Sequence, residues 1–253
     1  MENKGLMGGL YKITEWITRI FVSNLLWLVC SIPFLFIGFT KLLLLAQSPN
    51  QTENLTLWLM AILAPFTLFP ATAALFALTR KWIMGDPDVP IFKTYFKAYK
   101  ENYKYSMIGG VFYTLLTVIM IIDYKVYMTQ LNNTQVIGMV MLVFLLLILV
   151  SMFNFFSTLV HYHMTIVQVI KNSILLTLVR PFRVFSTVLI VIVLGMITYR
   201  FPVFIVVGFA SLTACVAFFN FYGTYMKMQL KAEQLREARE AGLSDTEDKG
   251  TVK

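Results

Sequence analysis

Long apolar runs without charged side chains alternate with short polar segments along this chain. Six of these runs hold between 16 and 26 residues without Asp, Glu, Lys or Arg. They cover residues 20–40, 54–79, 105–122, 135–160, 184–199 and 201–226. Because a membrane-spanning helix needs roughly 20 apolar residues, the pattern predicts an all-α, polytopic membrane protein. Its main domain, residues 20–226, is expected to be a six-helix transmembrane bundle.

Amphipathic or charged segments flank the predicted bundle at both ends. Residues 1–19 carry apolar side chains at helical spacing, which predicts a cytoplasmic interfacial helix in the headgroup layer. Residues 227–253 predict a charged cytoplasmic tail. The tail is expected to begin as a helix, to stop near Gly242 and to be disordered from Ser244 onward.

A second amphipathic segment, residues 92–105, precedes the third run. Its aromatic side chains recur at helical spacing, and its lysines form a second stripe at offsets of 4, 7 and 11. The pattern predicts a helix that lies on the membrane surface, with its lysines toward anionic headgroups or a protein partner. The candidate interface residues are Lys93, Tyr95, Lys97, Tyr99, Lys100 and Lys104. Residues 165–179 show a weaker version of this pattern, and the pattern leaves open whether residues 161–183 are cytoplasmic or partly inserted.

Composition and charge agree with a membrane protein of defined orientation. Hydrophobic residues make up 58% of the chain and charged residues 13%, whereas soluble domains carry about 25% charged residues. Of the 21 lysines and arginines, 18 lie in segments that are cytoplasmic if both termini are inside, and only Lys41, Lys125 and Arg200 lie outside. The positive-inside rule therefore predicts a multi-pass protein of the cell membrane with cytoplasmic N and C termini. The net charge of +8 is read as this topology signal, not as a nucleic-acid site.

The predicted spans hold few groups that could carry chemistry. They contain no acidic or basic side chain, which argues against a proton- or sodium-coupled carrier. Asn24, Asn154 and Asn220 are the largest polar groups in the spans. They could line a polar path for a solute, or bond to neighbouring helices. The sequence shows no nucleophile–base set, metal cluster or phosphate loop, so we predict no catalytic site, no metal, no cofactor and no enzyme activity.

Several blocks of residues resemble one family of membrane proteins. The stretch from Asn24 to Pro33, followed by Gly38, is similar to the opening signature of the YesL-like proteins of Gram-positive bacteria. Residues 70–75 and the amphipathic block 92–104 continue the resemblance. Residues 39–69 separate blocks that lie almost directly together in the short family form. The resemblance marks Trp27, Pro33, Gly38 and Pro70 as structural signature residues.

The resemblance also gives an expected function. YesL-like proteins are described mainly as a domain of unknown function, and their genes tend to lie beside carbohydrate ABC importers and sensor kinases. This implies an accessory protein that binds the permease or the nucleotide-binding subunits of such an importer and assists its assembly or regulation. The alternative is a stand-alone channel or facilitator for a small solute. The pattern gives no prediction of homo-oligomerisation.

Overall fold

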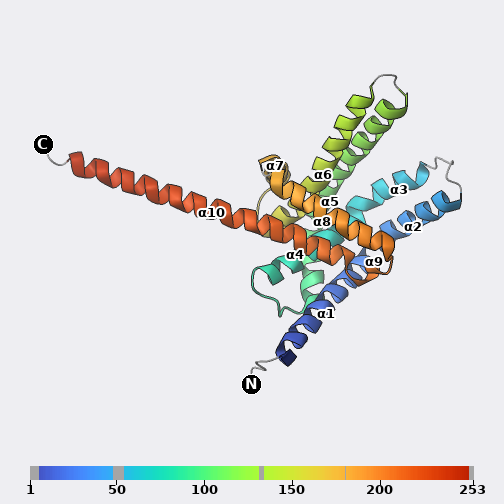
Figure 1. The fold of residues 1–253 in the computed structure, drawn as a ribbon, viewed down its shortest axis with the longest axis horizontal. Helices are drawn as coiled ribbons and strands as arrows, with labels where there is room; N and C mark the ends of the chain where they lie inside the picture. Colours follow the sequence, from blue (N-terminus) through green and yellow to red (C-terminus); the bar gives the residue numbers. More distant parts are fainter. Residues whose placement is uncertain (1–5, 48–53, 131–133, 180, 251–253) are drawn as a thin grey trace. The chain divides into compact units, whose positions relative to one another are not determined.

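The computed structural model describes residues 6–47, 54–130, 134–179 and 181–250, and these residues form helices without any strand (Figure 1). The chain divides into two units, residues 1–218 and residues 219–253. The helices of the first unit are α1 (Leu6–Cys30), α2 (Ile32–Gln47), α3 (Leu55–Leu63), the π-helical segment η1 (Ala64–Leu68), α4 (Phe69–Ile83), α5 (Ile91–Lys125), the π-helical segment η2 (Val126–Gln130), α6 (Gln135–His161), α7 (Ile166–Val179), α8 (Pro181–Arg200), α9 (Phe204–Val207) and the beginning of α10 (Phe209–Gly250).

The first helix crosses the boundary that the sequence predicted at residue 19. α1 runs from Leu6 to Cys30, so the described part of the interfacial segment continues directly into the first apolar run. That run is then interrupted at Ser31, where the chain turns before α2 begins. Pro33 explains the break, because it lacks an N–H and its ring clashes with the carbonyl one turn earlier. The first predicted span, residues 20–40, therefore comprises the second part of α1 and the first part of α2.

The second apolar run forms one path from Leu55 to Ile83 through α3, η1 and α4. The π-helical segment begins one residue before Pro65, and Pro70 lies in the first turn of α4. Single π turns inside α-helices accommodate prolines that cannot join the ordinary hydrogen-bond ladder. The helical path extends four residues beyond the predicted end at Thr79.

The predicted surface helix and third span form a single helix. α5 runs for 35 residues from Ile91, immediately after Pro90, and passes residue 105 without a break. The separation predicted there is wrong. The sequence changes from polar to apolar at this point, but nothing in it interrupts backbone hydrogen bonding.

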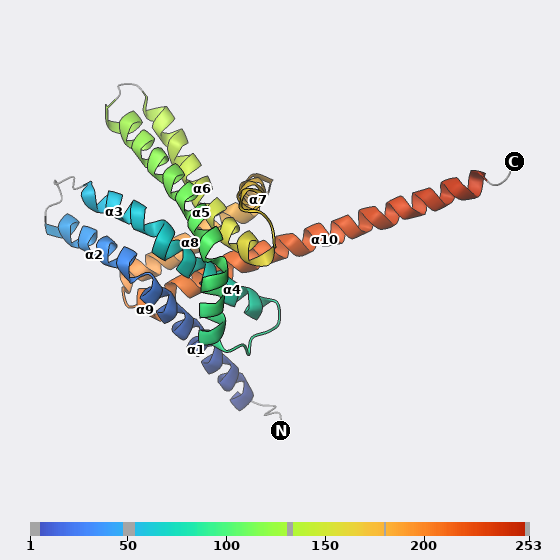
Figure 2. The ribbon, with the colours of Figure 1, turned by 180° about the vertical axis from the view of Figure 1, so that it is seen from behind.

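The core of the first unit lies between α4, α5 and α6, and Figures 1 and 2 both show α5 beside α6. Phe156 packs against Phe69 and Phe76 of α4, with ring centroids 5.3 and 5.4 Å apart, while Phe155 packs 5.3 Å from Tyr113 of α5. Glycine allows α5 to approach this closely. A Cβ added at Gly109 would lie 2.1 Å from the Phe155 ring.

Four helical stretches in the described residues are long and apolar enough to cross a membrane. They cover Gly9–Cys30, Leu55–Ile83, Ile91–Thr129 and Gln135–His161. Shorter apolar helices cover Ile32–Gln47, Ile166–Val179 and Phe185–Arg200. These helices support the predicted multi-pass membrane protein, and the count of six spans stays a prediction. The fourth predicted span, residues 135–160, agrees with α6 to within one residue.

The second unit consists of the remainder of α10, which is helical from Phe219 to Gly250. The sequence predicted a stop at Gly242 and disorder from Ser244, and the helix passes both positions. One glycine inside a helix costs only about 1 kcal/mol relative to alanine, and the segment contains no proline. Residues 251–253 of the predicted disordered end lie outside the described residues.

Candidate functional site

The first four turns of α5 present the predicted lysine stripe at the surface. Lys93, Lys97, Lys100 and Lys104 are all exposed. Phe92 and Phe96 lie beside them with exposed fractions of 61% and 46%. We call these six residues the α5 basic face. Residues four apart on a helix lie above one another, so the two phenylalanines form a short apolar ridge alongside the lysines.

The opposite side of the same turns is fixed to α4 and η1 by tyrosines. Tyr95 is fully buried, and its hydroxyl donates a hydrogen bond of 3.0 Å to the backbone carbonyl of Ala71. The Tyr103 hydroxyl donates to the carbonyl of Phe66 in η1, at 3.3 Å. Tyr99 is half-buried and its ring lies 5.7 Å from that of Tyr103. The assignment of Tyr95 to the interface is therefore wrong, because its aromatic ring faces the helix core.

Few acidic side chains of the described residues neutralise the lysines of the α5 basic face. Within the described residues, their one ion pair is between Lys97 Nζ and Glu101 Oε1, 3.8 Å apart. Both side chains are mostly exposed, so the pair contributes at most about 1 kcal/mol and is screened by salt. The face is therefore positively charged. Its charge suits anionic headgroups or acidic side chains.

The four signature residues lie where α1 and α2 meet α3 and α4. The indole N–H of Trp27 donates a 3.0 Å hydrogen bond to Thr72 Oγ1 of α4. Pro33 lies just after the break between α1 and α2, and Pro70 is fully buried in the first turn of α4. A Cβ at Gly38 would lie 3.5 Å from the Met60 side chain. These positions hold neighbouring helices together and carry no reactive group.

Both the NH2 group and the carbonyl oxygen of the Asn24 side chain form two hydrogen bonds each. Its Nδ2 donates to the carbonyls of Ile205 and Val206, at 2.8 Å each. Its Oδ1 accepts the backbone N–H groups of Ala210 and Ser211, at 3.0 and 3.3 Å. The amide thereby satisfies the ends of two helices, α9 and α10, which residue Gly208 separates. An amide used in this way presents no free group to a passing solute.

The other two asparagines of the predicted polar path belong to different units of the chain. Asn154 Nδ2 on α6 donates to Thr177 Oγ1 on α7, at 2.9 Å. Asn220 belongs to the second unit, where its backbone carbonyl accepts the Thr224 hydroxyl at 3.1 Å. No hydrogen bond within the first unit joins Asn24 to Asn154 among the described residues.

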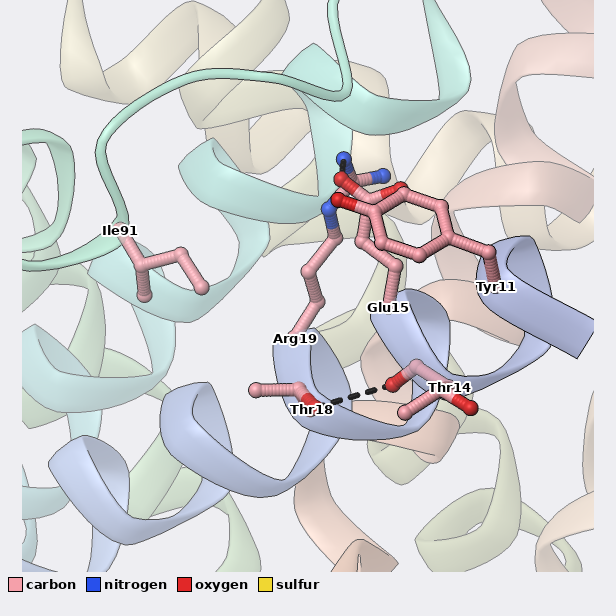
Figure 3. Close-up of a pocket in the computed structure, with 6 residues that line it drawn as sticks. All are labelled: Tyr11, Thr14, Glu15, Thr18, Arg19 and Ile91. Atoms are coloured by element: carbon pink, nitrogen blue, oxygen red, sulfur yellow. Dashed lines mark hydrogen bonds and ion pairs between the residues drawn. The ribbon is translucent and has the colours of Figure 1, made fainter. Parts of the chain in front are cut away.

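A surface pocket lies where α1 passes the beginning of α5 (Figure 3). It has a volume of about 370 Å³. Its lining residues are Tyr11, Thr14, Glu15, Thr18, Arg19 and Ile91. The buried Arg19 guanidinium bonds to Glu15 and, at 2.7 Å, to Asp88 Oδ1, and it lies over the Trp16 ring. The sequence analysis missed this network, because Arg19 and Asp88 are 69 residues apart and only a fold brings them together.

The described residues hold no group of three or more His, Cys, Asp or Glu side chains that could bind a metal ion. His161 ends α6 and lies against Tyr162 and Phe218, with ring centroids 4.8 and 6.3 Å away. Nothing in this arrangement indicates catalysis.

Comparison with known proteins identifies the part of the chain that carries the signature. Residues 20–124 match the family described as "Protein of unknown function, DUF624". The chain carries a YesL-like DUF624 region.

The DUF624 region begins near the middle of α1 and ends one residue before the end of α5. It contains the four signature residues, Asn24 and the whole α5 basic face, whereas Asn154 and Asn220 lie beyond it. The resemblance inferred from the residue blocks is therefore confirmed.

Three uncharacterised proteins of Bacillus subtilis (strain 168) are similar to this chain. YteU is 35% identical over 123 residues, which are 49% of this chain and 43% of YteU. YesL is 25% identical over 118 residues, covering 47% of this chain and 43% of YesL. YesV is 43% identical over 67 residues, covering 25% of this chain and 32% of YesV. The matched stretches thus span less than half of each relative, and no solved structure is significantly similar.

Proposed function

We propose that this chain is a non-catalytic accessory protein of the cell membrane that binds a carbohydrate ABC importer through the α5 basic face. In the proposed arrangement six helices span the membrane and both termini are cytoplasmic. The α5 basic face then lies on the cytoplasmic side, where the nucleotide-binding subunits and the cytoplasmic loops of a permease are found.

The observation that carries the proposal is the two-sided character of the first turns of α5. Tyr95 and Tyr103 fix one side to α4 and η1, while the other side exposes lysines and two phenylalanines. A helix held in place before binding loses little conformational entropy on binding, so its side chains are suited to a specific interface. Aromatic residues are enriched at such interfaces, so Phe92 and Phe96 are the anchors expected on this face.

The identity of the partner rests on the YesL-like resemblance, because the genes of that family tend to lie beside carbohydrate ABC importers. Anionic lipid is the competing partner for the same lysines. The two can be distinguished by shape, since attraction to headgroups depends on charge and distance, whereas a protein interface also depends on the fit of Phe92 and Phe96.

The test is recovery of importer subunits with the affinity-tagged chain from native membranes, identified by mass spectrometry. Lys100→Glu and the double change Phe92→Ala and Phe96→Ala should each reduce recovery of the permease or the nucleotide-binding subunit at least fivefold. The matched control is Lys125→Glu, which reverses one exposed charge at the other end of α5 and should leave recovery unchanged. Equal recovery for all variants would contradict the proposal.

The second candidate, a stand-alone channel, has less support. A solute path through the bundle needs free polar groups, and Asn24 is saturated by four hydrogen bonds. The purified chain in liposomes should therefore give no sugar uptake under a proton or sodium gradient. Uptake above that of protein-free liposomes would contradict this expectation and would support a channel or a carrier.

A further inference from the structure

Arg80 is a half-buried cation without an anionic partner in the described part of the chain. It lies in the last turn of α4, and its Nε–H is buried and makes no hydrogen bond. Arg19, which is buried, differs in this respect, because it bonds to two carboxylates. The carbonyl end of α4 favours a positive charge nearby, but this leaves the buried Nε–H of Arg80 unsatisfied.

Further polar groups gather at the same end of the first unit. The Phe76–Phe156 contact joins α4 to α6 at 5.4 Å. Beyond this contact, Arg80 lies in the last turn of α4 and His161 in the last turn of α6. Thr158 lies one turn before His161, is fully buried and has a hydroxyl without a hydrogen-bond partner. Within the described residues, two adjacent helices thus carry a guanidinium with an unsatisfied Nε–H, a hydroxyl without a hydrogen-bond partner and an imidazole at one end of the bundle.

The position of this cluster indicates what kind of anion could reach it. The candidate spans Leu55–Ile83 and Gln135–His161 both end here. The ends of membrane spans lie at the depth where hydrocarbon gives way to phosphate-bearing headgroups. Basic pockets between transmembrane helices at this depth are known to bind anionic headgroups. Phosphate also matches arginine geometrically, because the guanidinium can donate two parallel hydrogen bonds to one phosphate.

We propose that Arg80 binds a phosphate group at the adjoining ends of α4 and α6. The phosphate belongs either to the headgroup of an anionic lipid or to a small soluble phosphate compound. The inference is independent of the α5 basic face and of any importer.

The test uses the purified full-length chain in nanodiscs and detergent, with lipid binding followed by native mass spectrometry. Phosphatidylglycerol should bind more tightly than phosphatidylcholine, and Arg80→Gln should weaken phosphatidylglycerol binding about tenfold, the loss expected for charge-assisted hydrogen bonds. The control Lys81→Gln removes the neighbouring exposed charge. Its effect should disappear at high salt, where attraction between exposed charges is screened, whereas the effect of Arg80→Gln should persist.

A second arm separates the two sources of phosphate. Inorganic phosphate is added to the lipid-free protein in detergent, and the thermal midpoint is compared with that in sulfate-free, phosphate-free buffer. A rise that Arg80→Gln abolishes, without selective lipid retention, assigns the site to a soluble phosphate. Selective retention of phosphatidylglycerol without such a rise assigns it to lipid.

The proposal can be tested even if Arg80→Gln does not fold well, because a second variant and the unaltered protein give independent results. Arg80→Lys keeps the charge and should retain more phosphatidylglycerol than Arg80→Gln. If the unaltered protein at high salt neither prefers phosphatidylglycerol to phosphatidylcholine nor responds to phosphate, the proposal is overturned. Equal phosphatidylglycerol binding by Arg80→Gln and the unaltered protein, together with an equal response of both to inorganic phosphate, would overturn it as well.

Discussion

At the scale of single residues, several described polar side chains inside the first unit join one helix to another. The Asn24 amide shows this most fully, since it bonds to four backbone groups near the junction of α9 and α10. The Tyr113 hydroxyl likewise lies 2.8 Å from Ser151 Oγ, between α5 and α6. Interhelical hydrogen bonds in membranes contribute on average about 0.6 kcal/mol each, so residues that form several of them should stand out on mutation.

We expect Asn24→Ala to lower the free energy of unfolding by about 2 kcal/mol, because it leaves four backbone groups unpaired. Asn154→Ala removes a single bond to Thr177 and should cost about 0.6 kcal/mol. Denaturant unfolding in detergent micelles gives both values. Equal losses for the two variants would contradict the structural role assigned to Asn24.

Tyr95 and Phe96 are adjacent in the chain and face opposite environments, so they form a matched pair. Tyr95→Ala empties a fully buried site and should cost about 3 kcal/mol. Phe96→Ala changes an exposed ring and should alter stability by less than about 0.5 kcal/mol. Thermal unfolding of both variants tests this difference. A large loss from Phe96→Ala would show that the α5 basic face is covered in the isolated protein.

At the scale of helices, sequence patterns predicted some elements well and others poorly. The run 135–160 agrees with α6, and the amphipathic segment predicted from residue 92 begins within one residue of the start of α5. Helices α1 and α5 continue across the polarity changes at residues 19 and 105. A change in polarity marks depth in a membrane, whereas a helix ends where its backbone hydrogen bonds end. Periodicity placed Tyr95 and Lys97 on one helix, but only the packing of α5 on α4 shows which of them is buried.

The contact between α5 and α6 depends on the absence of a side chain at Gly109. Gly109→Ala would place a methyl group 2.1 Å from the buried Phe155 ring and should destabilise the protein by about 1–3 kcal/mol. Gly195→Ala in α8 meets no atom within 4 Å and should be neutral or stabilising by up to about 1 kcal/mol. Melting temperatures of the two purified variants provide the comparison. A neutral Gly109→Ala would mean that α5 and α6 are less tightly packed than the structure shows.

At the scale of the whole molecule, the distribution of basic residues predicts how the chain is oriented in the membrane. With six spans and both termini inside, cysteines introduced at Asn54 and Lys125 should react with impermeant reagents from outside the cell. A cysteine at Lys100 should react only after the membrane is opened. All three positions are exposed. Labelling of the Asn54 or Lys125 position from the cytoplasmic side alone would contradict the topology.

The bonds of Asn24 also have a consequence for the synthesis of the protein. Their partners lie up to 187 residues later in the chain, and translation proceeds at roughly 5–20 residues per second. The ribosome therefore needs about 10 to 40 seconds after making Asn24 before its last partner exists. During that time the amide must be satisfied by water, lipid or an insertion factor. A chain that ends at residue 124 contains the whole DUF624 region but never receives these partners, so we expect it to be degraded rather than to accumulate as a separate domain.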